Sequence, residues 1–91
     1  MSILPEQAGI ALKGSNFTVV KKIGKAGDEI PRHNHPEANV LFTIVKGKIE
    51  VFLNDVPHMV TPGQMIHFDG VNYINAKLHE DSEAYVTLIL K

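Results

Sequence analysis

Short runs of β-branched and aromatic residues, each closed by turn-forming residues, constrain the fold of this chain more than any other feature. Such runs recur along the 91 residues. The breaks between them include the pairs Lys46-Gly47, Asn54-Asp55, Pro62-Gly63 and Asp69-Gly70. Glycine, proline, asparagine and aspartate adopt the backbone angles that tight turns need. No stretch repeats apolar residues at helical spacing, so the pattern predicts an all-β sandwich or barrel without substantial helix.

About eight strands are expected from these runs. They cover residues 17–23, 29–34, 39–45, 48–53, 58–60, 64–68, 72–78 and 84–90. The chain contains no cysteine, so disulfides cannot stabilise it. A chain of this length then depends on burial, a bound metal or self-association for its stability. We expect one domain over residues 1–91, in which residues 1–16 form an N-terminal arm that can pack on a partner subunit.

The last expected strand, 84–90, has apolar side chains on both of its faces. Val86 and Leu88 share one face, and Tyr85 and Ile89 share the other, because side chains alternate along a strand. In so small a domain the second face needs a cover. A second copy of the chain is the simplest cover, so we expect a homodimer.

Charge and hydropathy exclude two classes of partner. The formal net charge of -1 gives no field that attracts nucleic acid or an anionic membrane. The N-terminal residues have neither the basic region nor the apolar run of a signal peptide, and no later stretch reaches transmembrane length. A cytoplasmic location is the resulting expectation.

Two histidines, His33 and His35, are one residue apart between Pro31 and Pro36. On a strand, residues i and i+2 point to the same face, so the two imidazoles can be presented to one point in space. Neutral imidazole is the commonest metal-ligating side chain. The pair alone is a weak signal, since histidines on strands also occur as packed or solvated residues.

The surroundings of this pair resemble the first sequence motif of the cupin superfamily. In that family a glycine, five residues and H-x-H are followed by three or four residues, a glutamate, six residues and a second glycine. Here Gly27 is followed by five residues and by His33 and His35, and Gly47 comes after the next apolar run.

A later stretch resembles the second cupin motif. In "TPGQMIHFDG", Pro62-Gly63 opens an expected strand and Asp69-Gly70 closes it. The resemblance covers about residues 20–90 and implies a small single-domain cupin, a β-barrel of jelly-roll type. It also implies a site inside the barrel around His33 and His35.

The ligand set that the resemblance implies is incomplete in this chain. The motif glutamate falls at Val40 or Asn39, and neither side chain carries a carboxylate. Glu37 is close in sequence, but its offset is wrong for a residue that reaches in from the next strand. The histidine of the second motif falls within residues 72–74, where none occurs. His33 and His35 are therefore the two matched metal ligands.

Two other residues are candidates to complete a metal site. His67 lies on the strand that cupin architecture places beside the one carrying the motif glutamate, although Ile66 and Phe68 as a core-facing pair would turn it outward. Tyr73, near the position of the missing histidine, could ligate iron or hydrogen-bond a ligand. His58 and His79 are expected to be solvated. The apolar wall of the pocket is expected to include Val40, Phe42 and Phe68.

Two functions remain open on this reasoning. One is a metal-dependent enzyme in which His33 and His35 bind iron, manganese, zinc or nickel and a small organic substrate, as in cupin dioxygenases and isomerases. The alternative is a non-catalytic module that binds a small organic ligand, as in sensing cupins, with a degenerate metal site. A purely structural dimer would leave two inward-facing histidines without partners, which is costly.

Overall fold

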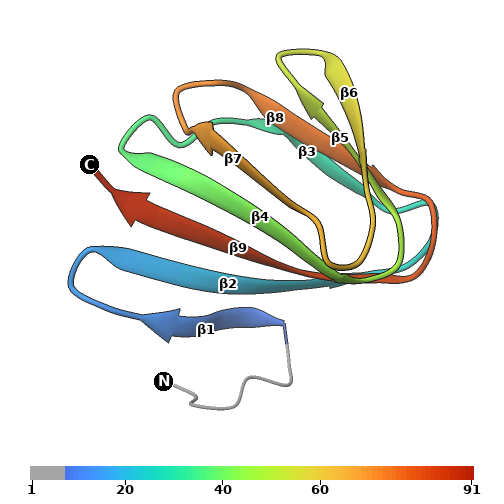
Figure 1. The fold of residues 1–91 in the computed structure, drawn as a ribbon, viewed down its shortest axis with the longest axis horizontal. Helices are drawn as coiled ribbons and strands as arrows, with labels where there is room; N and C mark the ends of the chain where they lie inside the picture. Colours follow the sequence, from blue (N-terminus) through green and yellow to red (C-terminus); the bar gives the residue numbers. More distant parts are fainter. Residues whose placement is uncertain (1–7) are drawn as a thin grey trace.

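The computed structural model describes residues 8–91, which form nine strands and no helix (Figure 1). The strands are β1 (Gly9–Lys13), β2 (Phe17–Gly24), β3 (Glu29–His33), β4 (Ala38–Lys46), β5 (Ile49–Leu53), β6 (Val56–Val60), β7 (Met65–Asp69), β8 (Ile74–Leu78) and β9 (Ser82–Leu90). The prediction of an all-β fold is confirmed. Within residues 8–91 no helix is long and apolar enough to cross a membrane.

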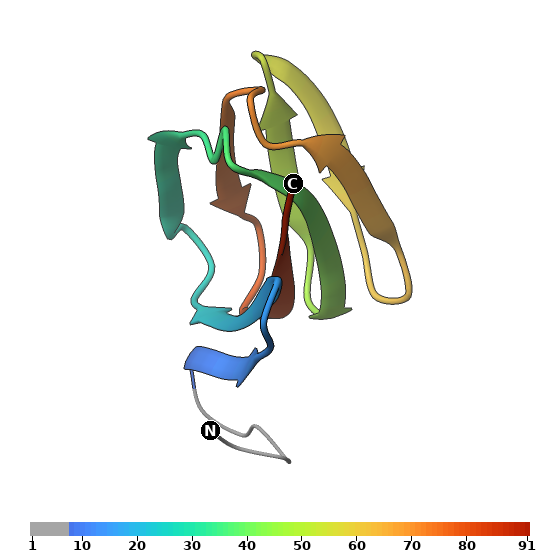
Figure 2. The same ribbon diagram turned by 90° about the vertical axis from the view of Figure 1, so that its left-hand side faces the viewer.

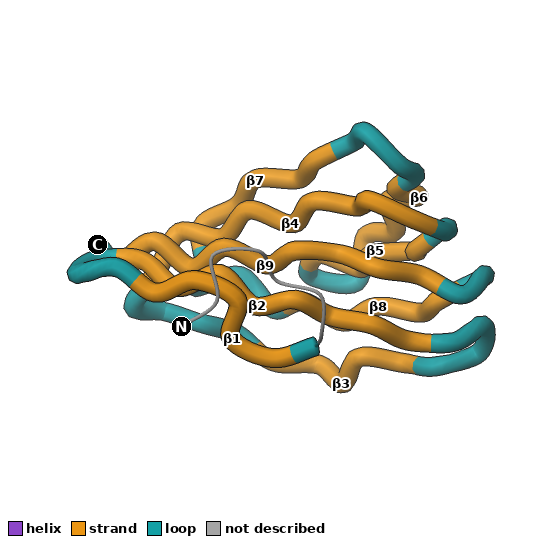
Figure 3. Tube along the Cα trace, turned by 90° about the horizontal axis from the view of Figure 1, so that it is seen from below, coloured by secondary structure: helices purple, strands orange, loops and turns teal. Residues whose placement is uncertain are grey.

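The strands form two antiparallel sheets. One has the order β1-β2-β9-β4-β7, and the other has the order β3-β8-β5-β6. Figure 3 shows the five strands of the larger sheet side by side, with the smaller sheet behind them. In Figure 2, β3 and β7 lie on opposite sides of the molecule. Strand neighbours that are far apart in sequence, such as β2 and β9, are typical of double-sheet jelly rolls.

The core lies between the two sheets and follows from the alternation of side chains. In β4, Ala38, Val40, Phe42 and Ile44 are all buried, while the residues between them are half-buried. Side chains of both sheets complete the core, including Ile49, Val51, Val60, Phe68, Ile74, Ala76, Leu78 and Ala84. Burial of apolar area is the main favourable term for a chain without disulfides.

The strand that sequence reasoning missed is β1. It pairs with β2 of the same chain, with Gly9 opposite Lys21 and Lys13 opposite Thr18. It belongs to the segment expected to form an N-terminal arm, whose first part, residues 1–7, lies outside the described residues. The described part of the arm is therefore an edge strand of its own sheet.

Several strand boundaries differ from the prediction by one or two residues, and at β8 and β6 the structure gives the reason. Strand β8 begins at Ile74 rather than at residue 72, because Asn72 and Tyr73 belong to a turn. The side chain of Asn54 fixes that turn: its amide donates to Asn72 Oδ1 at 2.8 Å, and its Oδ1 accepts from the Tyr73 N–H at 3.0 Å. Strand β6 begins at Val56, before Pro57. Proline is tolerated there because β6 is an edge strand.

Candidate functional site

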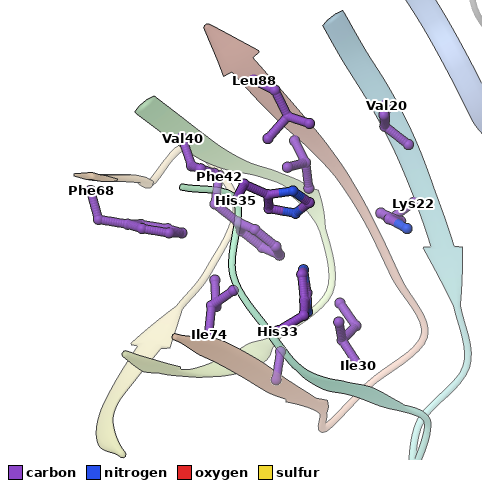
Figure 4. Close-up of a pocket in the computed structure, with 12 residues that line it drawn as sticks. Val20, Lys22, Ile30, His33, His35, Val40, Phe42, Phe68, Ile74 and Leu88 are labelled. Carbon is purple, nitrogen blue, oxygen red and sulfur yellow. The ribbon is translucent and has the colours of Figure 1, made fainter. Parts of the chain in front are cut away.

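A cavity of about 300 Å³ lies between the two sheets (Figure 4). Strands β2, β4, β7 and β9 of the larger sheet and β3 and β8 of the smaller sheet contribute to its wall, together with the segment that joins β3 to β4. The lining residues are Val20, Lys22, Ile30, His33, His35, Val40, Phe42, Phe68, Ile74, Ala76, Val86 and Leu88. The cavity is therefore apolar except for one lysine and two histidines.

The three residues expected to form an apolar wall all line this cavity. Val40 and Phe42 project from β4 and Phe68 from the adjacent strand β7, and all three are buried. Val40 is the cross-strand partner of Phe68, which brings both to the same face of the sheet.

His33 and His35 both face the cavity, from the end of β3 and from the segment that follows it. Their ring centroids are 4.9 Å apart and the ring planes meet at 84°. The close-up shows the two imidazoles side by side, with apolar side chains around them (Figure 4). Sequence spacing and structure thus bring two imidazoles to one wall of one cavity.

The tautomer of His33 follows from its contact with Pro31. Nδ1 of His33 lies 2.7 Å from the carbonyl oxygen of Pro31. A carbonyl oxygen can only accept, so Nδ1 carries the proton and donates. In the neutral ring, Nε2 of His33 therefore keeps its lone pair, and no group in residues 8–91 donates to it.

The surroundings of His35 favour its neutral form. Partial burial lowers the pKa of His35 below its usual value, and Coulombic interactions with His33 and Lys22 lower it further. The carboxylate of Glu37, 3.8 Å from Nδ1 of His35, acts in the opposite direction. Glu37 is itself exposed and does not line the cavity.

Two expected site residues lie elsewhere. His67 is exposed on the face of β7 opposite Phe68 and is absent from the cavity wall. Tyr73 is 45% exposed in the turn before β8, and its ring stacks on the Arg32 guanidinium with 4.9 Å between ring centroid and Cζ. The structure does not bring either side chain to His33 and His35.

Lys22 is the cavity residue that sequence reasoning missed. It is exposed and yet lines the cavity, so it lies where the cavity opens to solvent. The available signal was the alternation in "TVVKKIG", which places Lys22 on the same face as Val20. Because Val19 and Ile23 make the other face equally apolar, the sequence did not show which face points inward.

A divalent metal does not fit the residues of this cavity well. Iron sites of this kind use two histidines and a carboxylate, and catalytic zinc sites use three protein ligands. Across residues 8–91, no three histidine, cysteine or acidic side chains gather in a group that could hold a metal ion. The positive charge of Lys22 on the same cavity further opposes a bound cation.

Solved structures of several proteins share this fold. A KdgF protein from a Halomonas species superposes with a TM-score of 0.84 and 20% identity, over 93% of this chain and 78% of that one. An RmlC-like cupin from Desulfovibrio desulfuricans gives a TM-score of 0.83 and 21% identity, over 91% and 80%. These likenesses confirm the predicted jelly-roll fold.

Sequence comparison identifies the family. A protein from Arthrobotrys oligospora, named as an oxidoreductase, is 40% identical over 47 residues, which are 52% of this chain and 19% of that protein. The chain thus matches less than a fifth of that relative's length. The cupin domain family matches residues 20–89. This range spans β2 to β9 and includes every residue of the cavity wall, and the chain belongs to the cupin domain family.

Proposed function

We propose that this cupin binds a small organic molecule inside its barrel without a resident metal. The observation that carries the proposal is the pair of imidazoles on the wall of an otherwise apolar cavity of about 300 Å³. Small-molecule sites combine mostly apolar walls with a few convergent polar groups, and this volume is at the lower end of their range of roughly 300–1,000 Å³.

The polar atoms of the cavity also support a ligand. His33 is half-buried, so a ligand in the cavity can replace water as the hydrogen-bond partner of its ring. Within residues 8–91, Pro31 satisfies Nδ1 of His33, and Nε2 of the same ring stays available to a hydrogen-bond donor in the cavity. A ligand with an apolar body and one polar end matches this distribution.

A metal-dependent enzyme of dioxygenase or isomerase type is the second candidate. The contact between His33 and Pro31 favours it, because metal-ligating histidines usually donate their other ring N–H to a carbonyl or carboxylate. The relative named as an oxidoreductase also favours catalysis, although the match covers only 19% of that protein. Because residues 8–91 supply no third metal ligand beside His33 and His35, we rank this candidate second.

A fragment screen by ¹H–¹⁵N NMR tests the binding proposal. We expect some small organic compounds to shift the amide signals of His33, His35 and Ala76, which belong to the cavity wall. Val20→Phe fills part of the cavity and should abolish these shifts, at an overpacking cost of about 1–3 kcal/mol. Val56→Phe is the matched control, because Val56 is exposed on β6 and lies outside the cavity.

Two results would contradict the proposal. One is a screen in which no compound perturbs the cavity residues. The other is binding that persists unchanged in a folded Val20→Phe protein, since the ligand would then occupy some other surface.

A further inference from the structure

We propose that the polar end of the ligand is a carboxylate, bound by Lys22 and His35 at the mouth of the barrel. This inference rests on the proposed binding function and specifies its ligand class. It starts from the one charged side chain on the cavity wall, a lysine that the metal hypothesis leaves without a role.

The cavity has a polar side and an apolar side. Lys22 projects from β2, whereas Phe68 projects from β7, and β9 and β4 lie between these two strands in the larger sheet. Figure 4 shows Phe68 and Val40 on one side of the cavity and Lys22 on the other, with the two histidine rings between them. A ligand can therefore place its apolar body against Phe68 and its polar end toward Lys22.

The charges around this polar side favour an anion. No carboxylate lines the cavity, and within residues 8–91 no acidic side chain forms an ion pair with Lys22. Asp28 and Glu29 share an adjacent hollow with Lys22, but within residues 8–91 neither forms an ion pair with it, and Asp28 accepts the backbone N–H of Lys25 at 2.9 Å. The ammonium group is thus free to meet a ligand anion beside a poorly solvated apolar wall.

Lys22 and His35 line the same cavity, and Figure 4 shows their side chains on neighbouring parts of its wall. A bound carboxylate would accept hydrogen bonds from the ammonium of Lys22 and from a ring N–H of His35. Hydrogen bonds between charged partners are roughly twice as strong as neutral ones. The Nε2 lone pair of His33 would accept from a hydroxyl group on the same ligand or from water.

Matched pairs of probes separate charge from shape. Benzoate and benzamide, and isovalerate and isovaleramide, have nearly the same size but differ in charge. We expect each carboxylate to bind the wild-type protein roughly tenfold more tightly than its amide, as a charge-assisted hydrogen bond predicts. Titrations followed by ¹H–¹⁵N NMR report both the affinity and the site.

Variants assign the preference to Lys22. Lys22→Met keeps an apolar stem and removes the charge, so carboxylate and amide should then bind about equally, while Lys22→Arg should keep the preference. Lys77→Met is the matched control, because Lys77 is exposed on the outer face of β8. An unchanged spectrum elsewhere in Lys22→Met shows that the fold is retained.

The outcomes distinguish the two proposals. If amides bind in the cavity as tightly as carboxylates, or if Lys22→Met keeps the carboxylate preference, the carboxylate inference is overturned and the binding function stands. If no probe or fragment of either kind binds in the cavity, the binding function itself fails.

Discussion

The backbone N–H of His35 donates a hydrogen bond of 2.7 Å to the carbonyl oxygen of Gly70. The Gly70 N–H in turn donates to the carbonyl oxygen of Ala38 at 2.8 Å. A Cβ atom on Gly70 would overlap the carbonyl oxygens of both His35 and Ala38. A glycine is needed at position 70 because two backbone segments approach each other there, and this approach sets the position of His35 in the cavity.

Gly70→Ala is therefore expected to move His35 as well as to destabilise the protein. The added methyl group meets backbone atoms that cannot rotate away, and overpacking of this kind costs about 1–3 kcal/mol. Urea unfolding measures the loss of stability, and the ring signals of His35 in NMR spectra report its displacement. Gly63→Ala is the control: that position has a φ of 88° but open space around it, so stability should fall while the His35 signals stay in place. Unmoved His35 signals in Gly70→Ala would contradict the prediction.

The lowered pKa of His35 predicts a loss of stability in acid. Burial and the charges of His33 and Lys22 disfavour the protonated ring in the folded protein, whereas the unfolded chain takes up the proton at the usual pKa of about 6.5. The unfolded state then binds more protons below this pH, so the free energy of unfolding falls as the pH decreases through the lowered pKa. Above the usual pKa of about 6.5, His35 makes its full contribution to the free energy of unfolding.

Urea unfolding between about pH 5 and pH 8 measures this slope, and His35→Gln removes the part due to His35. A variant with the same slope as the wild-type protein would show that His35 titrates alike in both states.

Metal content tests the absence of a resident metal. We expect far less than one equivalent of iron, manganese, zinc or nickel in protein purified without a chelator or a histidine tag, because two imidazoles beside a lysine bind divalent cations weakly. Elemental mass spectrometry gives the content, with the His33→Ala/His35→Ala protein as the matched control. Near-stoichiometric metal that disappears in the double variant would instead favour the enzyme.

The outer face of the larger sheet predicts a homodimer. Thr87 lies on this face between its cross-strand partners Val19 and Leu41, all three of them only half-buried. Sedimentation equilibrium at micromolar concentration should give about twice the chain mass of 10.0 kDa. Thr87→Lys should give the monomer mass, because it places a charge in the apolar contact. Asn75→Lys, on the outer face of β8, should leave the dimer intact, and a monomeric wild-type protein would refute the prediction.

The strands were predictable where alternation and turn residues agree. The run at residues 39–45 is apolar except for Asn39 and Thr43, Gly47 follows two residues after its end, and it lies within β4. Strand β1 was missed because "GIALK" has no β-branched cluster and is held by pairing with β2 alone. Such pairing depends on the tertiary fold, so the strand propensity of the residues themselves does not predict it.

The site was predictable only in part, for a similar reason. The spacing of His33 and His35 and the family motif predicted two imidazoles on one inward face, although β3 ends at His33 and His35 lies in the segment that follows it. The inward direction of Lys22 depends on which side of β2 meets the second sheet, and both sides of that strand are apolar. The positive charge of Lys22 at the mouth of the cavity could therefore be recognised only in the structure.

The place of β9 has a consequence for how this protein is made. Strand β9 lies between β2 and β4, and it supplies Val86 and Leu88 to the cavity wall. During synthesis, β2 and β4 emerge from the ribosome long before residues 82–90 and must wait for the strand that joins them. Until then the nascent chain exposes two unpaired strand edges and an open core, so neither the larger sheet nor the binding site can be completed before translation has passed β9.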